Sequence, residues 1–173
     1  MNTKRLFLYH LVCKFLPPSK CHDLKTVILR WCGAKVGKNV EIMSTAKIYG
    51  ELDLIIGDNV FIGHDALIMG PRESKIIIED YAKVASRAII VTGYHKFEPN
   101  GQCISGEGRC ANIIIKKGSV ISTGSIVYPG KIIGPMAYVS AGSVVTHDVP
   151  ELTRVGGVPA REILKFPKES SIF

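Results

Sequence analysis

The chain has 173 residues, of which 46% are apolar and 21% are charged, and its 22 Lys and Arg against 15 Asp and Glu give a formal net charge of +7. This length favours one globular domain with a full core. The apolar fraction excludes a disordered chain, and the sequence contains no uncharged apolar run of about 18 residues that would predict a membrane-spanning helix. Five scattered cysteines, without a cleavage site behind Met1, lead us to expect reduced thiols in a cytoplasmic protein.

Residues 1–35 form a basic amino-terminal segment that we expect to be helical. Residues 3–16 predict a short, mostly apolar helix that ends at Pro17, and Asp23 should cap a second helix that ends at Trp31. Asp23 is the only acidic residue of the segment, which carries seven basic ones: Lys4, Arg5, Lys14, Lys20, Lys25, Arg30 and Lys35. The chain has no helix-turn-helix, zinc-finger or aromatic-studded motif, so we do not expect a nucleic-acid partner.

Two interpretations of this segment stay open. The helices could cap the open end of the fold that follows, because an uncovered terminal strand is an exposed sheet edge. Alternatively, a basic and apolar face could rest on an anionic membrane surface.

From residue 36 to residue 150 an aliphatic residue recurs with a period of six, interrupted by two short insertions and one long one. All fifteen of these positions are Ile or Val: Val36, Ile42, Ile48, Ile56, Ile62, Ile68, Ile78, Val84, Ile90, Ile115, Ile121, Val127, Ile133, Val139 and Val145. Three residues after them come mostly Gly, Asn or Asp, which tolerate the positive φ that a sharp corner needs: Asn39, Asn59, Asp65, Gly93, Gly118, Gly124, Gly130, Gly142 and Asp148. Short strands joined by regular corners therefore predict an all-β solenoid.

Three hexads make one turn of 18 residues, and each turn buries its inner face only by stacking on its neighbours. The fifteen hexads predict five coils, at 36–53, 56–73, 78–95, 115–132 and 133–150. A long loop, 96–114, follows the third coil, and residues 151–173 form a tail for which we expect a short strand, a turn and a final helical piece.

The long loop is where we expect chemistry, because loops of this length in compact repeat proteins are usually functional. His95 stands at its mouth, and a neutral imidazole is a suitable general base near neutral pH. The group that orients His95 could be the carboxylate of Glu98 or Glu107, or a backbone carbonyl. Cys103 and Cys110 could in principle carry an acyl group, but no second histidine adjoins them.

The hexads Ile-Gly-Asp-Asn-Val-Phe and Ile-Gly-Pro-Met-Ala-Tyr resemble those of the hexapeptide-repeat acyltransferases. The Thr-Gly-Tyr-His run before the loop, and the later Gly-Gly-Val-Pro-Ala-Arg, are similar to the galactoside and maltose acetyltransferase branch and its polysaccharide-modifying relatives. The resemblance implies a left-handed parallel β-helix, a homotrimer with active sites between subunits, and acetyl-CoA as the acetyl donor. It also implies that His95 deprotonates the acceptor hydroxyl for direct attack on the thioester.

The same resemblance suggests the binding residues. Thr123 and Ala141 match backbone contacts to the pantetheine arm, and Arg161 is a plausible phosphate contact. The chain departs from the family at His147, where a Lys is usual, and at Ser122, where a Gly is usual. We keep His147 among the candidate cofactor-binding residues.

For the acceptor, the resemblance places a polar residue near Asp65, and His64 and Glu98 are further candidates. An alternative for Asp65 is that it only occupies a corner. We expect a sugar hydroxyl of a bacterial surface polysaccharide (capsule, O-antigen or exopolysaccharide) as the acceptor, free or lipid-linked, which would place the enzyme in the cytoplasm or at the inner face of the cytoplasmic membrane. N-acetylation of an amino-sugar nucleotide and a non-catalytic scaffold remain alternatives.

A metal centre is not expected. A zinc site of the kind found in some left-handed β-helices needs three converging imidazoles, two of them from one subunit at close spacing. His64, His95 and His147 are widely separated in the sequence, and the loop after His95 holds no second histidine.

Overall fold

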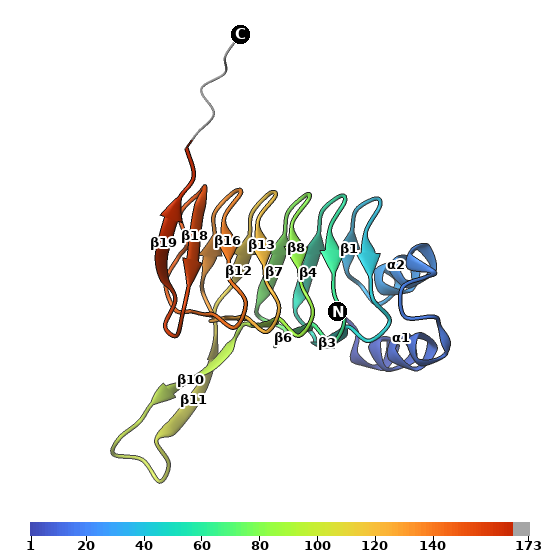
Figure 1. Cartoon of the computed structure of the whole chain (residues 1–173). Helices are drawn as coiled ribbons and strands as arrows, with labels where there is room; N and C mark the ends of the chain where they lie inside the picture. The colour runs from blue at the N-terminus through green and yellow to red at the C-terminus, as the bar shows by residue number, and fades with distance from the viewer. Residues whose placement is uncertain (168–173) are drawn as a thin grey trace.

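A computed structural model describes residues 1–167, in which short parallel strands wind into a three-sided solenoid with helices α1 (Thr3–Phe15) and α2 (His22–Trp31) at one end (Figure 1). Each side is one sheet. Face A contains β1 (Lys35–Val36), β4 (Asp53–Ile56), β7 (Lys75–Ile78), β12 (Ile113–Ile115) and β15 (Ile132–Ile133). Face B contains β2 (Glu41–Ile42), β5 (Phe61–Ile62), β8 (Lys83–Val84), β13 (Val120–Ile121), β16 (Tyr138–Val139), β18 (Thr153–Gly156) and β19 (Arg161–Lys165). Face C contains β3 (Lys47–Gly50), β6 (Leu67–Gly70), β9 (Ile89–Val91), β14 (Ile126–Val127) and β17 (Val144–Val145).

The predicted aliphatic positions form three ladders, one along the inside of each face. On face B, for example, Ile42 pairs with Ile62, which pairs with Val84, and the ladder continues through Ile121 and Val139. All fifteen positions except the half-buried Val36 are buried. The predicted parallel β-helix of about five coils is therefore confirmed.

Each corner is named by the two faces that it joins. Most of the corners adopt the predicted conformation. Seven of the nine Gly, Asn and Asp corner residues have positive φ: Asn39, Asn59, Asp65, Gly118, Gly124, Gly130 and Gly142. The same conformation is imposed on Tyr81, Arg87 and Met136, which occupy this column in other coils. The coil geometry therefore overrides residue preference at these three corners.

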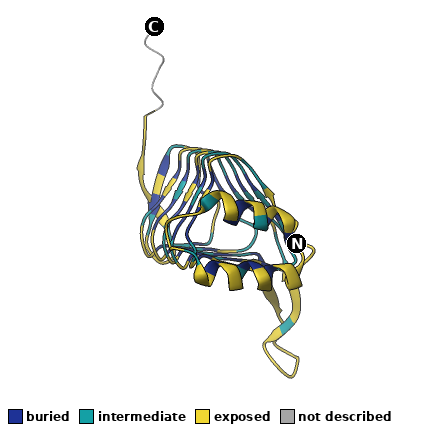
Figure 2. Cartoon of the chain, turned by 90° about the vertical axis from the view of Figure 1, so that its right-hand side faces the viewer, coloured by how far each residue is buried: buried dark blue, intermediate teal, exposed yellow. Residues whose placement is uncertain are grey.

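The two helices lie across the open end of the prism, with their buried residues facing it (Figure 2). Leu6, Tyr9 and Cys13 of α1 and Leu29 of α2 join the core of the first coil. The second helix begins at His22, with Cys21 as its cap, so the prediction that Asp23 caps it was wrong. Within residues 1–167, neither helix is long and apolar enough to cross a bilayer.

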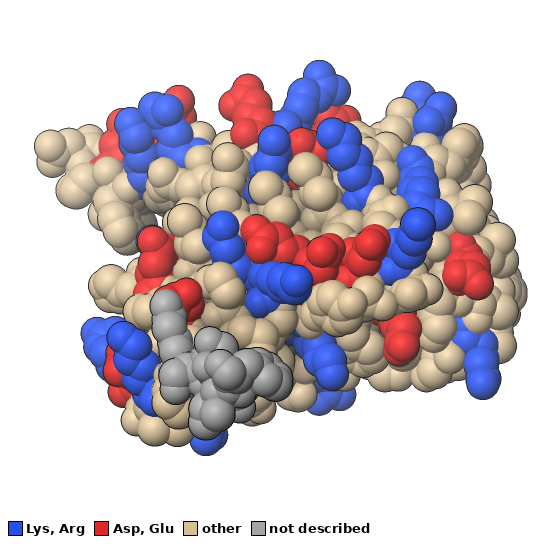
Figure 3. Space-filling view, turned by 90° about the horizontal axis from the view of Figure 1, so that it is seen from above, with Lys and Arg blue, Asp and Glu red and all other residues tan. Residues whose placement is uncertain are grey.

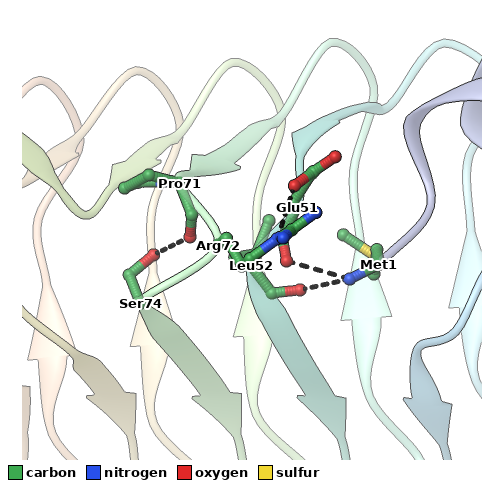
Figure 4. A network of polar contacts seen from close by, with 6 residues as sticks. All are labelled: Met1, Glu51, Leu52, Pro71, Arg72 and Ser74. Carbon is green, nitrogen blue, oxygen red and sulfur yellow. Dashed lines mark hydrogen bonds and ion pairs between the residues drawn. The ribbon is translucent and has the colours of Figure 1, made fainter.

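Polar contacts attach this helical layer to the coils at the C–A corner (Figure 4). The Met1 amino group donates to the carbonyl oxygens of Glu51 and Leu52, at 2.9 and 3.0 Å. In the next coil Arg72 Nε lies 2.8 Å from Glu51 Oε2, and the Ser74 hydroxyl donates to the Pro71 carbonyl. The amino-terminal end of the chain is therefore tied to the first coil, and the Glu51–Arg72 ion pair joins this coil to the second.

The tail extends face B and forms no helix within the described residues. Strand β18 adds to the sheet in parallel, and β19 returns antiparallel to it. The prediction of a final helical piece was thus wrong as far as Pro167, and residues 168–173 lie outside the described part.

A buried polar cluster beneath the helices predicts alkaline sensitivity. Burial raises the pKa of the Cys13 and Cys32 thiols above the ordinary 9.0, and it raises the pKa of Tyr9 well above 10.0. Above about pH 9 the unfolded chain therefore releases protons that the folded chain retains, so stability should fall as pH rises. Burial lowers the pKa of Lys25 below 10.5, which makes the folded state more stable as pH rises. Because Cys13, Cys32 and Tyr9 all act in the opposite direction, we expect the net stability to fall.

We expect a lower thermal midpoint near pH 10 than near pH 7.5, measured by circular dichroism. The variant Cys13→Ala should reduce this difference, whereas Cys21→Ala, at an exposed thiol, should leave it unchanged. Equal midpoints at both pH values would contradict the prediction.

Candidate active site

A β-hairpin projects from the solenoid between the third and fourth coils (Figure 1). Its strands β10 (Gly93–Phe97) and β11 (Ser105–Cys110) are antiparallel, and they replace the C–A corner that would join β9 to β12. The segment expected to be a loop from residue 96 is therefore largely an extended two-stranded arm. Ile113–Ile115 pairs with Ile76–Ile78 directly after it, so the coil stacking resumes unchanged.

His95 is an exposed residue of this hairpin, and its Nδ1 lies 2.9 Å from the carbonyl oxygen of Gly106. A carbonyl oxygen only accepts, so Nδ1 must carry the proton that it donates. In the neutral ring the lone pair is then on Nε2. This tautomer is the one in which Nε2 can remove a proton from a substrate.

Within the described residues, neither carboxylate considered from the sequence forms a hydrogen bond or an ion pair with His95. Glu107 Oε2 lies 2.6 Å from Arg109 Nη2 and 3.9 Å from Lys96 Nζ. Glu98 lies beside Gly106, where an added Cβ would come within 2.5 Å of Glu98 Oε2. Of the three possibilities left open by the sequence, the structure has the backbone carbonyl in contact with His95.

A groove of about 660 Å³ runs beside the imidazole. Gly108 is opposite His95 in the hairpin, and a Cβ at Gly108 would make an ordinary van der Waals contact with His95 Cε1, at 3.8 Å. Sequence reasoning did not single out Tyr94 or Arg109, although both are neighbours of His95 in the hairpin. The lining residues are Met69, Pro71, Glu73, Val91, Gly93, Tyr94, His95, Glu107, Gly108, Arg109 and Cys110.

A second group of candidate residues lies at the B–C corner, on the other edge of face C. Asp65 has positive φ, and its backbone N–H donates to Thr45 Oγ1, which also lies 3.1 Å from His64 Nδ1. Two coils further on, the backbone N–H of Gly142 donates to the Thr123 carbonyl, so Thr123 and Ala141 stack in adjacent coils. Both are exposed, as is Asp65.

Two further candidates lie at the last coil, His147 at a corner and Arg161 in face B. His147 occupies the C–A corner of the last coil, and it lines a groove of about 460 Å³ together with Arg161 of β19. Within one copy of the chain, the structure therefore does not bring His64 and Asp65 to His95. Apart from Arg161, the candidate residues divide between the two edges of face C.

Comparisons with known proteins agree with this architecture, although no family model matches the chain. Over 143 residues it is 29% identical to the "putative colanic acid biosynthesis acetyltransferase WcaF" of Escherichia coli K12, which covers 83% of this chain and 75% of that protein. A maltose O-acetyltransferase from Clostridium difficile 630 superposes with a TM-score of 0.76 at 25% identity, over 96% of this chain and 87% of that one. The chain is related to the hexapeptide-repeat acetyltransferases.

This relationship confirms the resemblance inferred from the hexads and identifies the chain as an acyltransferase. A variant of AntD, an N-acyltransferase from Bacillus cereus in complex with dTDP and coenzyme A, shares the fold, with a TM-score of 0.70 at 23% identity over 89% of this chain and 94% of that one. The solenoid therefore occurs in proteins named for O-acylation and for N-acylation.

The acyltransferase departs locally from the family pattern at two places. Ser122 is buried at the B–C corner, and its Oγ has no hydrogen-bond partner in the described structure. His147 is exposed, and its Nδ1 lies 3.0 Å from Thr146 Oγ1. Among residues 1–167 no three His, Cys, Asp or Glu side chains gather to hold a metal ion.

Proposed function

We propose that the acyltransferase transfers the acetyl group of acetyl-CoA to a sugar hydroxyl, with His95 as the general base, in bacterial surface-polysaccharide biosynthesis. The observation that carries the proposal is the hydrogen bond from His95 Nδ1 to the Gly106 carbonyl, which leaves Nε2 of the neutral ring unprotonated. The named biosynthetic relative supports the polysaccharide setting.

The chemistry needs only one catalytic side chain. Nε2 removes the hydroxyl proton as the oxygen attacks the thioester carbonyl, the C–S bond breaks, and the leaving thiolate takes the proton back from the imidazolium. A base of this kind contributes about 10² to 10⁴ in rate. No acyl-enzyme on Cys103 or Cys110 is required.

The donor would lie along the later coils. The stacked corner residues Thr123 and Ala141 offer backbone groups to the pantetheine amides, and the groove with His147 and Arg161 offers positive charge to the phosphates. Glu162 and Asp148 also line that groove, so its charge is mixed. For the acceptor we retain Asp65, His64 and Glu98 as binding candidates.

A complete site would form between copies of the chain in a homotrimer. Three copies around an axis parallel to the solenoid, with face C inward, would set the B–C corner of one copy beside the C–A hairpin of the next. Face C suits such contact because its outward side chains form an apolar ladder of Leu67, Ile89, Ile126 and Val144, flanked by the exposed Tyr49, Met69 and Tyr128.

The trimer proposal predicts that Ile126→Lys yields folded monomers. The free-energy cost of burying an unpaired ammonium in the contact would exceed the free energy gained from the apolar association. Sedimentation equilibrium should give about three times 18.9 kDa for the wild type and about 18.9 kDa for the variant. Ile77→Lys, at an outward position of face A, is the matched control and should remain trimeric. A monomeric wild type would contradict the proposal.

The acceptor class is tested by thiol release from acetyl-CoA with a panel of hydroxyl and amine sugars, free and lipid-linked. Turnover with hydroxyl sugars, without formation of a base-stable amide product, supports the proposal. Turnover confined to amino-sugar nucleotides would favour the N-acetyltransferase alternative. A chain without turnover on any acceptor would be a scaffold.

We place the reaction in the cytoplasm, with peripheral contact at the inner face of the cytoplasmic membrane when the acceptor is lipid-linked. The basic amino-terminal segment supports this placement.

A further inference from the structure

The outward side of the two helices is unusually apolar. Residues of both helices expose large side chains away from the core, and we call them the outer helical surface: Phe7, Leu8, Leu11, Val12, Phe15, Leu24, Val27 and Trp31. Phe15 is 83% exposed and Phe7 is 68% exposed, so the solenoid does not cover them.

Closing the end of the prism does not explain this surface. The inward residues Leu6, Tyr9 and Leu29 are buried and already cover the first coil. A helix that only caps a core should carry polar residues on its outer side. A contiguous exposed apolar patch instead marks an interaction surface.

Basic side chains surround the outer helical surface. Lys4 and Lys14 of α1 and Lys20 of the connecting segment are exposed, and none forms an ion pair in the described residues. Over the coils, by contrast, acidic and basic side chains are interspersed, and several are paired, as Lys75 is with Asp53 (Figure 3). The positive charge is thus concentrated where the apolar side chains are exposed.

We infer that the outer helical surface docks on an anionic lipid bilayer. Apolar side chains would enter the acyl boundary, while the lysines meet the lipid phosphates. An end-to-end contact between two copies would bring these same lysines together, and like charges oppose that arrangement. Charge complementarity therefore favours the bilayer over a second copy.

A groove of about 440 Å³ continues this surface along the side of α1. Phe7 and Leu11 belong to both, and Lys14 and Tyr49 of β3 also line the groove. The apolar surface thus extends from the outer side of the helix toward face C.

The docking geometry also indicates what kind of acceptor the enzyme would use, and this conclusion rests on the proposed function. The helical layer is about 10 Å thick, and two coil spacings of about 4.8 Å separate the first coil from the third, from which the hairpin projects. The reacting hydroxyl would then lie about 20 Å from the bilayer. The acceptor would be a lipid-linked saccharide several sugars long, acetylated away from its lipid phosphate.

Trp31 supplies a direct probe, because it is the single tryptophan of the chain and lies on the outer helical surface. We expect its emission to shift to the blue when vesicles of phosphatidylcholine with phosphatidylglycerol are added at low salt. Pure phosphatidylcholine vesicles should produce little shift, and about 0.5 M salt should reverse the anionic response.

Matched variants separate charge from burial. Replacing Lys4, Lys14 and Lys20 by Gln should lower the vesicle partition coefficient about fivefold per charge, or roughly 100-fold together. The variant Phe7→Ser with Phe15→Ser should lose the blue shift. The control, Ile163→Ser with Lys165→Gln, removes exposed apolar and basic groups from β19 at the opposite end, and it should bind like the wild type.

Equal binding to neutral and anionic vesicles, or none to either, would overturn the inference. So would salt-sensitive end-to-end association of copies, seen by sedimentation without vesicles. Thiol release with a soluble acceptor should be the same in the lysine variant and the wild type. Vesicle binding is measured without any acceptor, so its failure is distinguishable from failure of the proposed acetyl transfer.

Discussion

Replacing His95 by alanine should lower kcat for acetyl transfer by about 10² to 10⁴ while the protein remains folded. The alanine removes the only imidazole on the hairpin, and an alcohol is a weak nucleophile without a base. His95 is exposed, so little stability should be lost with it. Thiol release, measured at saturating acetyl-CoA and acceptor, gives the ratio.

Glu107→Gln provides the companion measurement. Its carboxylate pairs with Arg109 and Lys96, so a change in kcat of less than about tenfold is expected if the Gly106 carbonyl alone orients the imidazole. A wild-type rate in His95→Ala would refute the proposed base. A loss in Glu107→Gln as large as that in His95→Ala would show that this carboxylate takes part in orienting the ring during turnover.

Replacing Ile76 by alanine should destabilise the solenoid by about 2 to 5 kcal/mol. Ile76 is fully buried in β7, between Leu54 of the coil before and Ile113 of the coil after. Removing its outer carbons leaves a cavity that the stacked coils on both sides prevent from collapsing. Chemical denaturation followed by circular dichroism measures the loss.

The adjacent Ile77 is the matched control, because it is the same residue type in the same strand but points outward. Ile77→Ala should cost less than about 1 kcal/mol. Equal losses for the two variants would mean that the inward and outward sides are packed alike, which would contradict the burial pattern of β7.

The period of six was sufficient to predict the three ladders, because every coil must bury one aliphatic side chain on each face to stack at all. The positions of the corners could be predicted from the same period. At two of these corners, Tyr81 and Met136 adopt positive φ, so the coil geometry overrides the conformational preference of the residue. His95 was proposed as the catalytic base partly because it stands where the repeat is interrupted.

What the sequence could not supply depends on pairing between distant segments. Every residue has a carbonyl, so nothing in the residue type of Gly106 marks its oxygen as the partner of His95. Strand β19 exposes all five of its residues and exists because it pairs with β18, an interaction that local propensity does not reveal. The separation of Asp65 from His95 likewise became visible only when their corners were known.

The hairpin after the third coil interrupts the chain without interrupting the stack, since Ile78 and Ile115 are paired directly across it. The solenoid therefore places no constraint on the length or sequence of this arm beyond its two anchor points. Insertions or deletions within the arm should therefore leave the buried ladders of the solenoid in place.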